Sequence, residues 1–267
     1  MITLKNVSAG YNGIDVISEI SLSVKDGDNL CILGPNGCGK TTLIKAISGL
    51  IKSKGNISID DRNISKMTRT EIGKNIAVMS QISSVYFSYS VYETVLLGRF
   101  VHMKNNAFKN PSPKDKEYAE KCLKAVGLLK YRDRQINTLS GGQLQRVYLA
   151  RTLAQEPRVI LLDEPTNHLD LKHQAVLIDF LKEWSIENNH SVIGVLHDIN
   201  LAMRLADNVL FLKDGSTIAY GKANDIISSD LLNKVYDMDV VDFMLDSLRR
   251  WERFEDKTYY NNIRKVK

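Results

Sequence analysis

Two spacings of apolar residues follow one another along the chain, and they predict strands and helices in turn. Residues 2–11, ITLKNVSAGY, alternate apolar and polar side chains, which predicts an edge or half-buried strand. Shorter runs that are almost wholly apolar are typical of buried strands. The remaining predicted strands are NLCILG (29–34), GNISIDD (55–61), NIAVMSQ (75–81), VILLD (159–163), SVIGVLH (191–197) and the hairpin 208–221, which turns at Asp214-Gly215.

Helical spacing fills the segments between these strands. KTTLIKAISGL (40–50) predicts a helix closed by Gly49, and most of residues 83–155 is predicted helical. Leu177, Ile178, Leu181 and Trp184 form a stripe that we assign to the core. Buried strands that alternate with helices predict an α/β fold with a largely parallel sheet, and the helical middle is interpreted as an inserted subdomain.

Composition narrows the class of protein. The 267 residues are 43% hydrophobic and 25% charged, with a net charge of +5, as in an ordinary soluble globular protein. Basic residues are dispersed, so we expect a solvated mixed surface and no nucleic-acid partner. Cys31, Cys38 and Cys122 lack CxxC pairing, which fits a reducing cytoplasm. The sequence shows no signal peptide and no apolar run long enough to span a bilayer, so any spanning segments are expected in another chain.

The stretch GPNGCGKTT fits the phosphate-loop pattern G-x-x-x-x-G-K-[ST] and lies between a predicted strand and a predicted helix. Its glycines let the backbone wrap around phosphate oxygens. Lys40 can reach the β- and γ-phosphates, Thr41 can ligate Mg²⁺, and the amide of Thr42 lies at the positive end of the helix. We therefore expect a nucleotide to contact Gly34, Pro35, Asn36, Gly37, Cys38, Gly39, Lys40, Thr41 and Thr42.

Four polar residues at strand ends complete a candidate catalytic set. Asp163 ends a buried strand, where a carboxylate needs a partner such as Mg²⁺. Glu164 follows and should point elsewhere because strand side chains alternate, so it is the candidate for polarising the attacking water. His197 ends the next strand and can contact the γ-phosphate. Gln81 ends NIAVMSQ and can sense Mg²⁺ or water, although a glutamine or histidine at a strand end favours a structural role when taken alone.

A second candidate phosphate loop, LSGGQ, stands at 139–143 ahead of a helical stretch. The hydroxyl of Ser140 and the amides of Gly141 and Gly142 can bind an anion at a helix start. One domain has no evident use for two such loops.

These motifs, in this order, resemble the nucleotide-binding subunit of an ABC transporter over about residues 1–235. By position, Tyr11 matches the aromatic residue that stacks on adenine, and Val16 packs nearby. The remaining matches are the Walker A loop (34–42), the Q-loop (Gln81), the signature LSGGQ with Ser140, Gly141, Gly142 and Gln143, the Walker B strand with Asp163 and Glu164, the D-loop (167–170) with Asp170, and the switch histidine His197.

The resemblance implies a P-loop NTPase (RecA-like) core with a mainly parallel sheet, an N-terminal antiparallel β subdomain and an inserted α-helical subdomain. It implies ATP and Mg²⁺ as cofactors, with Thr41, Gln81 and Asp163 serving the metal. It also implies a head-to-tail homodimer, in which the signature of one subunit covers the nucleotide of the other. The second loop would then be half of a neighbour's site.

Within the family, FSYSVYETVLLGRFVHMK (87–104) and LLNKVYDMDV (231–240) are similar to importers for iron–siderophore complexes, haem and cobalamin. Ser90 and Val101 depart from that group's usual threonine and proline. A zinc, manganese or molybdate importer and an exporter ATPase remain as alternatives, and a non-transport ABC ATPase is a third. The implied partners are separate transmembrane permease subunits and, indirectly, an extracytoplasmic substrate-binding protein, which places the chain at the cytoplasmic face of the membrane.

Three further expectations concern the domain boundary, a docking segment and Cys38. We expect an ATP-binding domain at 1–240, with the helical subdomain at about 83–155 inserted, and an extension at 241–267 of unknown role. Residues 83–105 are expected to form a groove for a permease helix, with subdomain packing as the alternative. Cys38 lies in the phosphate loop, where a helix start can lower a thiol's pKa and allow redox inhibition, although a small residue that merely fits is the simpler interpretation.

Overall fold

The structure is a computed structural model and describes residues 1–79, 89–103, 110–167 and 169–252. Its contacts divide the chain into two compact units, residues 1–223 and 224–267, which are described separately. The domain boundary that the sequence places at residue 240 stays a prediction.

The N-terminal strands form an antiparallel sheet in the order β2-β1-β4-β5. Inward-facing residues pair across it, as where Leu4 lies opposite Leu22 on one side and Ile57 on the other. The half-buried character predicted for residues 2–11 is confirmed, but an edge position is wrong because β1 has neighbours on both sides. Alternation reports which face is buried and says nothing about the number of neighbouring strands. The strands are β1 (Ile2–Tyr11), β2 (Ile14–Val24), β4 (Ser53–Ile59) and β5 (Arg62–Asn63).

A second sheet has the order β10-β9-β3-β8-β7-β6 and is parallel except for the β9–β10 hairpin. Every residue of β3 and β8 is buried, which confirms the strands that the apolar runs predict. The hairpin turns at Asp214 and Gly215, both at positive φ, as such a two-residue turn requires. The strands are β3 (Leu30–Leu33), β6 (Ile76–Met79), β7 (Val159–Asp163), β8 (Ser191–Val195), β9 (Asn208–Lys213) and β10 (Ser216–Lys222).

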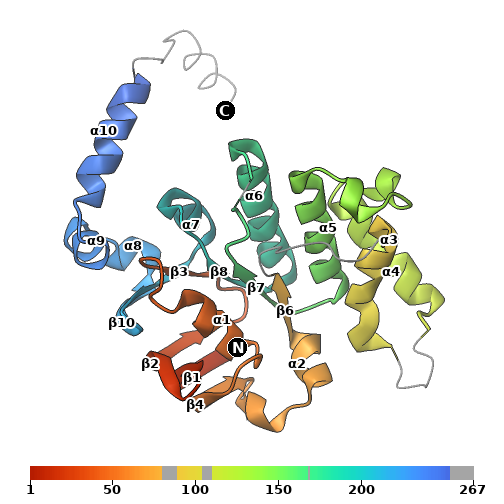
Figure 1. Cartoon of the computed structure of the whole chain (residues 1–267), viewed down its shortest axis with the longest axis horizontal. Helices are drawn as coiled ribbons and strands as arrows, with labels where there is room; N and C mark the ends of the chain where they lie inside the picture. Colours follow the sequence, from red (N-terminus) through yellow and green to blue (C-terminus); the bar gives the residue numbers. More distant parts are fainter. Residues whose placement is uncertain (80–88, 104–109, 168, 253–267) are drawn as a thin grey trace. The chain divides into compact units, whose positions relative to one another are not determined.

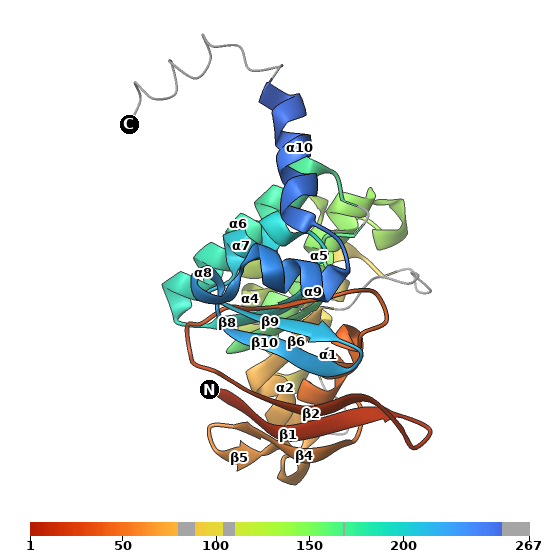
Figure 2. The ribbon, with the colours of Figure 1, turned by 90° about the vertical axis from the view of Figure 1, so that its left-hand side faces the viewer.

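The main core lies between these two sheets. Helix α1 (Lys40–Ile47) runs between them and contacts β1, β2 and β7 (Figures 1 and 2). Its Leu43 and Ile47 are fully buried together with Ile17 of β2 and Leu161 of β7. Helix α1 follows the phosphate loop directly, so this core fixes the direction of the helix start. Close to the end of α1, at Gly49, lie η1 (Ile64–Lys66) and α2 (Arg69–Asn75).

Helices α6 (Leu171–Asn188) and α7 (Ile199–Leu205) cover the other face of the parallel sheet, against β8 and β3 respectively (Figure 1). Leu177, Ile178 and Leu181 of α6 are buried, so the stripe that the sequence assigns to the core is confirmed. The sheet is therefore enclosed on both faces, as buried parallel strands require.

Helices that pack on one another lie between β6 and β7 in the sequence, as expected for an inserted helical subdomain. Ser90, Ser112 and Ser140 begin α3, α4 and α5 with capping boxes, in which the serine and the third helical residue satisfy each other's backbone amides. The elements are α3 (Val91–Leu96), η2 (Leu97–His102), α4 (Pro113–Ala125), η3 (Leu129–Tyr131), η4 (Ile136–Thr138) and α5 (Gly141–Ala154).

Arg99 joins three parts of this helical subdomain from inside. Its side chain is 4% exposed and lies 3.0 Å from a carboxylate oxygen of both Asp115 and Glu156. It also donates to the carbonyl of Ala154 at 2.9 Å and stacks over the ring of Tyr118. Burial opposes ionisation of Asp115, but the Ser112 hydroxyl and Arg99 outweigh it and lower the pKa of that carboxyl. Arg99 therefore holds η2, α4 and the end of α5 together.

Replacing Arg99 with methionine is expected to lower the free energy of unfolding by about 3 kcal/mol, because it leaves the Asp115 carboxylate buried without its cation. Equilibrium urea unfolding measures the effect. The matched control is Arg62→Met, whose partner Glu71 and own side chain are 37% and 56% exposed. Loss of that exposed pair should change the free energy of unfolding far less, because solvent screens it. Equal losses in the two variants would contradict the assignment.

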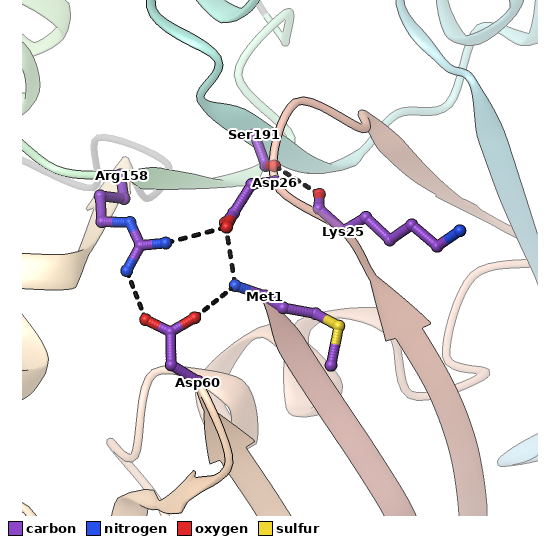
Figure 3. Close-up of polar contacts among 6 residues, drawn as sticks. All are labelled: Met1, Lys25, Asp26, Asp60, Arg158 and Ser191. Carbon is purple, nitrogen blue, oxygen red and sulfur yellow. Dashed lines mark hydrogen bonds and ion pairs between the residues drawn. The ribbon is translucent and has the colours of Figure 1, made fainter.

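A polar network joins the start of β1 to both sheets (Figure 3). The ammonium group of Met1 lies 2.8 Å from Asp26 and 2.7 Å from Asp60. Arg158, just before β7, bridges the same two carboxylates. Ser191, at the start of β8, donates to the carbonyl of Lys25 at 3.0 Å. The two sheets are thus linked by charge where β1, β7 and β8 begin and where β2 and β4 end.

The network shifts the ionisation of its members. The ammonium group of Met1 and then Arg158 lower the pKa of Asp60. Burial opposes protonation of Met1, but hydrogen bonds to Asp26 and Asp60 outweigh it and raise the pKa of the ammonium group. The Asp60 contribution to stability is present above its ordinary pKa of 3.8 and is lost as pH falls through the lower folded value. The Met1 contribution is complete below 8.0 and is lost as pH rises through the raised folded value.

Asp60→Asn is expected to lower the melting temperature by about 2 °C, the scale for an exposed network in a chain of this size. The difference from the unmodified chain should be largest between pH 4 and 8 and should shrink on both sides. Differential scanning calorimetry across pH measures it. Asp61→Asn is the matched control, because both residues have positive φ, which asparagine tolerates. An equal loss in both variants would argue against the network.

The second unit contains short helices within its described residues. They are α8 (Ala223–Ile226), α9 (Ser229–Tyr236) and α10 (Val240–Glu252). The first residue of α8 belongs to the first unit. Asp239 caps α10 by accepting from the amide of Asp242 at 2.9 Å. Helix α10 therefore begins at the boundary before the extension that the sequence places at 241–267. Throughout the described segments, no helix combines the length and apolarity that a bilayer crossing demands.

Candidate functional site

The phosphate loop connects β3 to α1, and its backbone requires glycine at two positions that decide its course. Gly34 and Gly39 have φ of 147° and 101°. A Cβ at Gly34 would collide with the carbonyl of Leu212, and one at Gly39 with the side chain of Ile17. The loop therefore keeps its amides and the start of α1 free of side-chain bulk.

Lys40 is buried, and its ammonium group folds over this loop. Its Nζ donates to the carbonyl of Gly34 at 2.9 Å and to that of Pro35 at 2.7 Å. The sequence predicts Lys40 as a phosphate ligand, and the structure places its charge at the centre of the loop. Two neutral carbonyls leave that charge uncompensated, so a phosphate would be a stronger partner.

Thr41 and Asp163 meet although 122 residues separate them. The Thr41 hydroxyl donates to Asp163 Oδ1 at 2.8 Å, at the carboxyl end of β7. Burial raises the pKa of Asp163, with the Thr41 hydrogen bond acting in the opposite direction. A hydroxyl and a carboxylate oxygen are the hard donors that Mg²⁺ prefers, and a nearby cation would favour the ionised form of Asp163.

Glu164 lies beside this pair. Its side chain is not oriented by strand alternation, which is the reason that the sequence analysis gave. Strand β7 ends at Asp163, and Glu164 has φ of 54°, in the left-handed region. The alternation argument is therefore wrong, because the chain has already left the strand. The carboxylate of Glu164 lies 2.7 Å from His197 Nε2 and accepts from Asn167 Nδ2 at 2.6 Å. Glu164 is held between two polar side chains at the sheet edge.

Sequence reasoning missed Asn167 as a site residue. The chain turns through Glu164, Pro165 and Thr166, and the amide of Asn167 donates back to the carbonyl of Glu164 at 3.3 Å. Proline in the second position of a four-residue segment is the signal that could have found this turn. The turn brings the Asn167 side chain back to the Glu164 carboxylate, three residues earlier in the sequence.

Tyr11 and Val16 lie on the other side of the loop. The Tyr11 side chain is 43% exposed, and the Lys45 ammonium group of α1 is 5.8 Å from its ring centre. A Cβ at Gly39 would lie 3.6 Å from Val16 Cγ1, so Val16 packs against the loop. Val16 therefore lies near the start of α1 and Tyr11 near its last turn, where the ring stays partly exposed.

The signature residues begin helix α5. Ser140 accepts from the amide of Gln143 at 3.3 Å, and Gln143 Oε1 accepts from the amide of Ser140 at 3.1 Å. A Cβ at Gly141 would meet nothing within 4 Å, which leaves this face of the helix start open. In the described segments, no hydrogen bond or ion pair joins residues 139–143 to residues 34–42. Within the described residues, the two loops therefore do not bond to each other.

Gly142 faces the segment that carries Asp170. A Cβ at Gly142 would lie 3.2 Å from the ring of His173. Asp170 caps α6 by accepting from the amide of His173 at 2.9 Å, and its Oδ1 lies 2.6 Å from His173 Nδ1. These two hydrogen bonds lower the pKa of Asp170. His173, which sequence reasoning did not single out, therefore connects the predicted D-loop with the signature helix.

Two further predictions concern residues of the site. Cys38 is buried, and burial raises the pKa of its thiol despite the charge of Lys40, which contradicts the lowered pKa on which redox inhibition depended. Gln81, predicted as a metal and catalytic residue, lies outside the described residues, as do His168 of the D-loop and parts of the expected permease groove.

A parallel sheet with this loop, the Thr41–Asp163 pair and Glu164 at its carboxyl edge defines a P-loop nucleotide hydrolase. The model of the family described as "ABC transporter" matches residues 17–167. The chain belongs to the ATP-binding subunits of that family and is an ATPase. It is 37% identical to the probable siderophore transport system ATP-binding protein YusV of Bacillus subtilis, over 89% of this chain and 86% of that protein. It is 34% identical to the ferric enterobactin transport ATP-binding protein FepC of Escherichia coli, over 87% and 85% respectively.

Solved structures agree with this assignment. A metal-chelate type ABC transporter in an inward-facing conformation superposes with a TM-score of 0.78, 29% identity and 89% coverage of both chains. The bacterial cassette MJ0796, solved as a dimer, has a TM-score of 0.71, 33% identity and coverage of 83% of this chain and 98% of its own. MJ0796 has also been solved as a dimer bound to ADP and Pi after hydrolysis. The predicted fold, with its parallel core, antiparallel β subdomain and inserted helices, is confirmed.

Proposed function

We propose that this chain is the ATP-hydrolysing subunit of a membrane importer, and that it hydrolyses ATP at the interface of a head-to-tail homodimer. The observation that carries the proposal is the Glu164 carboxylate, held between His197 and Asn167 beside the Thr41–Asp163 pair. In this arrangement one carboxylate is free to orient water, while another supports a cation. Relatives named as transport ATP-binding proteins support the role in transport.

Each residue then has a defined part in hydrolysis. Lys40 exchanges its two carbonyl partners for the β- and γ-phosphates. Glu164 accepts a hydrogen bond from the attacking water and aligns it with the γ-phosphorus. His197 orients the Glu164 carboxylate and stabilises charge that develops on the γ-phosphate. On the far side of the loop, the exposed ring of Tyr11 stacks on adenine beside Val16.

Mg²⁺ fits the oxygen donors at this edge. Thr41 would ligate it, Gln81 would contribute from its loop, and Asp163 would support it. When bound, the ion supplies positive charge that neutralises the phosphate oxygens. Burial is the main cause of the raised pKa of Asp163, and a bound cation would act with Lys45 and Lys40 to favour the ionised carboxylate.

The partner subunit completes the site in this proposal. Ser140, Gly141, Gly142 and Gln143 begin α5 with open backbone, and their own loop is not their ligand. In a two-fold dimer they would contact the γ-phosphate bound by the other subunit, with Asp170 close to the same interface. Because the two-fold axis forms this contact at both nucleotides at once, ATP would join the subunits and hydrolysis would release them.

Complementation between two inactive variants tests this composite site. Lys40→Ala should disable the nucleotide loop, and Gly141→Asp should disable the signature, so each homodimer has two defective sites. A mixed dimer has one site with both defects and one site with neither. Mixing should therefore restore ATP hydrolysis to roughly a quarter of the unmodified rate, since half of randomly paired dimers are mixed and each has one intact site. Persistent inactivity in a demonstrated mixed dimer would overturn the head-to-tail arrangement.

For the transported molecule we propose an iron–siderophore complex, haem or cobalamin. The names of the relatives YusV and FepC favour an iron chelate. The proposed partners are separate permease subunits, docked near residues 83–105, and indirectly an extracytoplasmic binding protein, which would hold this chain at the cytoplasmic face. Reconstitution with a candidate permease, followed by ATP-dependent uptake of labelled ferric siderophore, tests the assignment. Uptake of zinc, manganese or molybdate instead would favour the alternative importers.

A further inference from the structure

Helix α10 carries a continuous apolar stripe that the proposed ATPase function does not use. Val241, Met244, Leu248 and Trp251 recur at intervals of three, four and three residues, and Leu245 widens the same face. Leu245, Leu248 and Trp251 are 46%, 58% and 70% exposed. A helix of 13 residues with such a face gains most of its stability from packing, so the stripe is suited to an apolar partner.

The spacing of the stripe favours another helix as that partner. Intervals of three and four residues repeat every seven, which is the period of two helices that pack side by side. A binding groove would only require apolar anchors on one face. A seven-residue period keeps the stripe in register with a second helix along its whole length.

Charge along α10 favours a second copy in the opposite direction. Asp242 and Arg249 are seven residues apart, so they lie at the same edge of the stripe. Asp246 and Arg250 already pair within the helix at 2.7 Å, so Asp242 and Arg249 are the charges that the argument uses. In an antiparallel pair of identical helices, Asp242 of each chain lies opposite Arg249 of the other. A parallel two-fold pair would place this edge against the opposite edge of the partner helix, so Asp242 and Arg249 would not meet.

We propose that α10 pairs antiparallel with α10 of a second copy of this chain. This contact is separate from the nucleotide interface and needs no ATP. The cassette MJ0796 forms a dimer, so two copies in one assembly are in keeping with a relative that shares this fold. The two-fold symmetry of such a dimer is also the symmetry of an antiparallel helix pair.

The size of the contact determines its role. Two helices of 13 residues, each about 20 Å long, bury less surface than the roughly 1,200 Å² of a stable independent interface. We therefore expect a dissociation constant of about 10⁻⁴ M when no nucleotide is present. In the assembled dimer the same contact keeps the subunits at high local concentration after hydrolysis.

Sedimentation equilibrium of the full chain without nucleotide is the first test. The unmodified chain should show a weak, concentration-dependent dimer, and Leu248→Glu should raise the dissociation constant at least tenfold. Phe243→Glu is the matched control, because Phe243 is 63% exposed on the same helix but lies outside the stripe. A chain that stays monomeric at all concentrations, or a dimer that is equally weakened by both variants, would overturn the proposal.

A charge exchange tests the direction of pairing. Asp242→Arg and Arg249→Asp should each weaken the homodimer severalfold, because each places like charges opposite one another. An equal mixture of the two variants should recover the affinity of the unmodified chain, since both contacts then join opposite charges. Failure of the mixture to recover would overturn the antiparallel pair.

Site-specific cross-linking separates this contact from other occupants. The native thiols of Cys31, Cys38 and Cys122 are buried, so a cysteine placed at 245, near the centre of the stripe, would react selectively. Leu245→Cys should form a disulfide-linked dimer under mild oxidation, and Phe243→Cys should not. Binding of monomeric chain to anionic vesicles that is lost in Leu248→Glu would instead assign the stripe to a lipid surface and overturn the proposal. None of these measurements requires ATP hydrolysis, so failure here leaves the proposed function untouched.

Discussion

Glu164→Gln is expected to lower the rate of ATP hydrolysis by at least about 100-fold while ATP binding is preserved. Glutamine keeps the size of the side chain and can still bond to Asn167 or His197, but it cannot accept a proton from the attacking water. Binding depends on the phosphate loop, which the substitution leaves unchanged. ATP should therefore accumulate between two subunits, and size-exclusion chromatography with Mg²⁺-ATP should show a stable dimer.

Glu187→Gln is the matched control, because Glu187 is an exposed residue of α6 and its substitution should change neither rate nor association. Steady-state phosphate release and nucleotide binding by calorimetry separate the two effects. A Glu164→Gln chain that remained monomeric with ATP and kept its full rate would contradict both the catalytic assignment and the composite site.

Gly141→Asp is expected to lower hydrolysis by about 100-fold or more without loss of stability. Gly141 is the first residue of α5, where an aspartate is favourable for the helix dipole, and a Cβ there would meet nothing in its own subunit. The added carboxylate should repel the γ-phosphate held by the partner subunit. Melting temperature and ATP affinity of the monomer should be unchanged.

Gly141→Ala provides a graded comparison, because a methyl group adds bulk but no charge. It should reduce hydrolysis by about tenfold, less than aspartate does. Loss of ATP affinity in the monomeric Gly141→Asp chain would mean that the signature contacts the nucleotide of its own subunit, and it would refute the dimer.

The strands, the order of motifs and most of the site could be predicted because each depends on local pattern. A glycine loop between a buried strand and a helix has few possible conformations, so the position of Lys40 followed from sequence. The contact between Thr41 and Asp163 agrees with the metal set that the family resemblance implies. Parallel sheets explain it, because the carboxyl ends of their strands share one edge.

Other features depend on contacts that no local pattern records. The Met1–Asp26–Asp60–Arg158 network draws on residues as far apart as 157 positions, and each is an ordinary polar residue in its own segment. Arg99 lies in the stretch 87–104 that is similar to the importer group, but its burial depends on three elements that pack around it. The charged and aromatic composition near the C-terminus conceals α10, whose apolar side chains recur at intervals of three and four residues.

The left-handed backbone at Glu164 has an evolutionary consequence. A non-glycine residue there costs about 1 kcal/mol that glycine or asparagine would largely recover. Selection for stability alone should therefore replace Glu164 early, and in the role proposed for Glu164 the replacement would abolish hydrolysis. A glutamate retained at this position in a descendant of this chain would thus be a sign that hydrolysis is still under selection, whereas glycine or asparagine would mark a lineage that has kept the fold and abandoned the reaction.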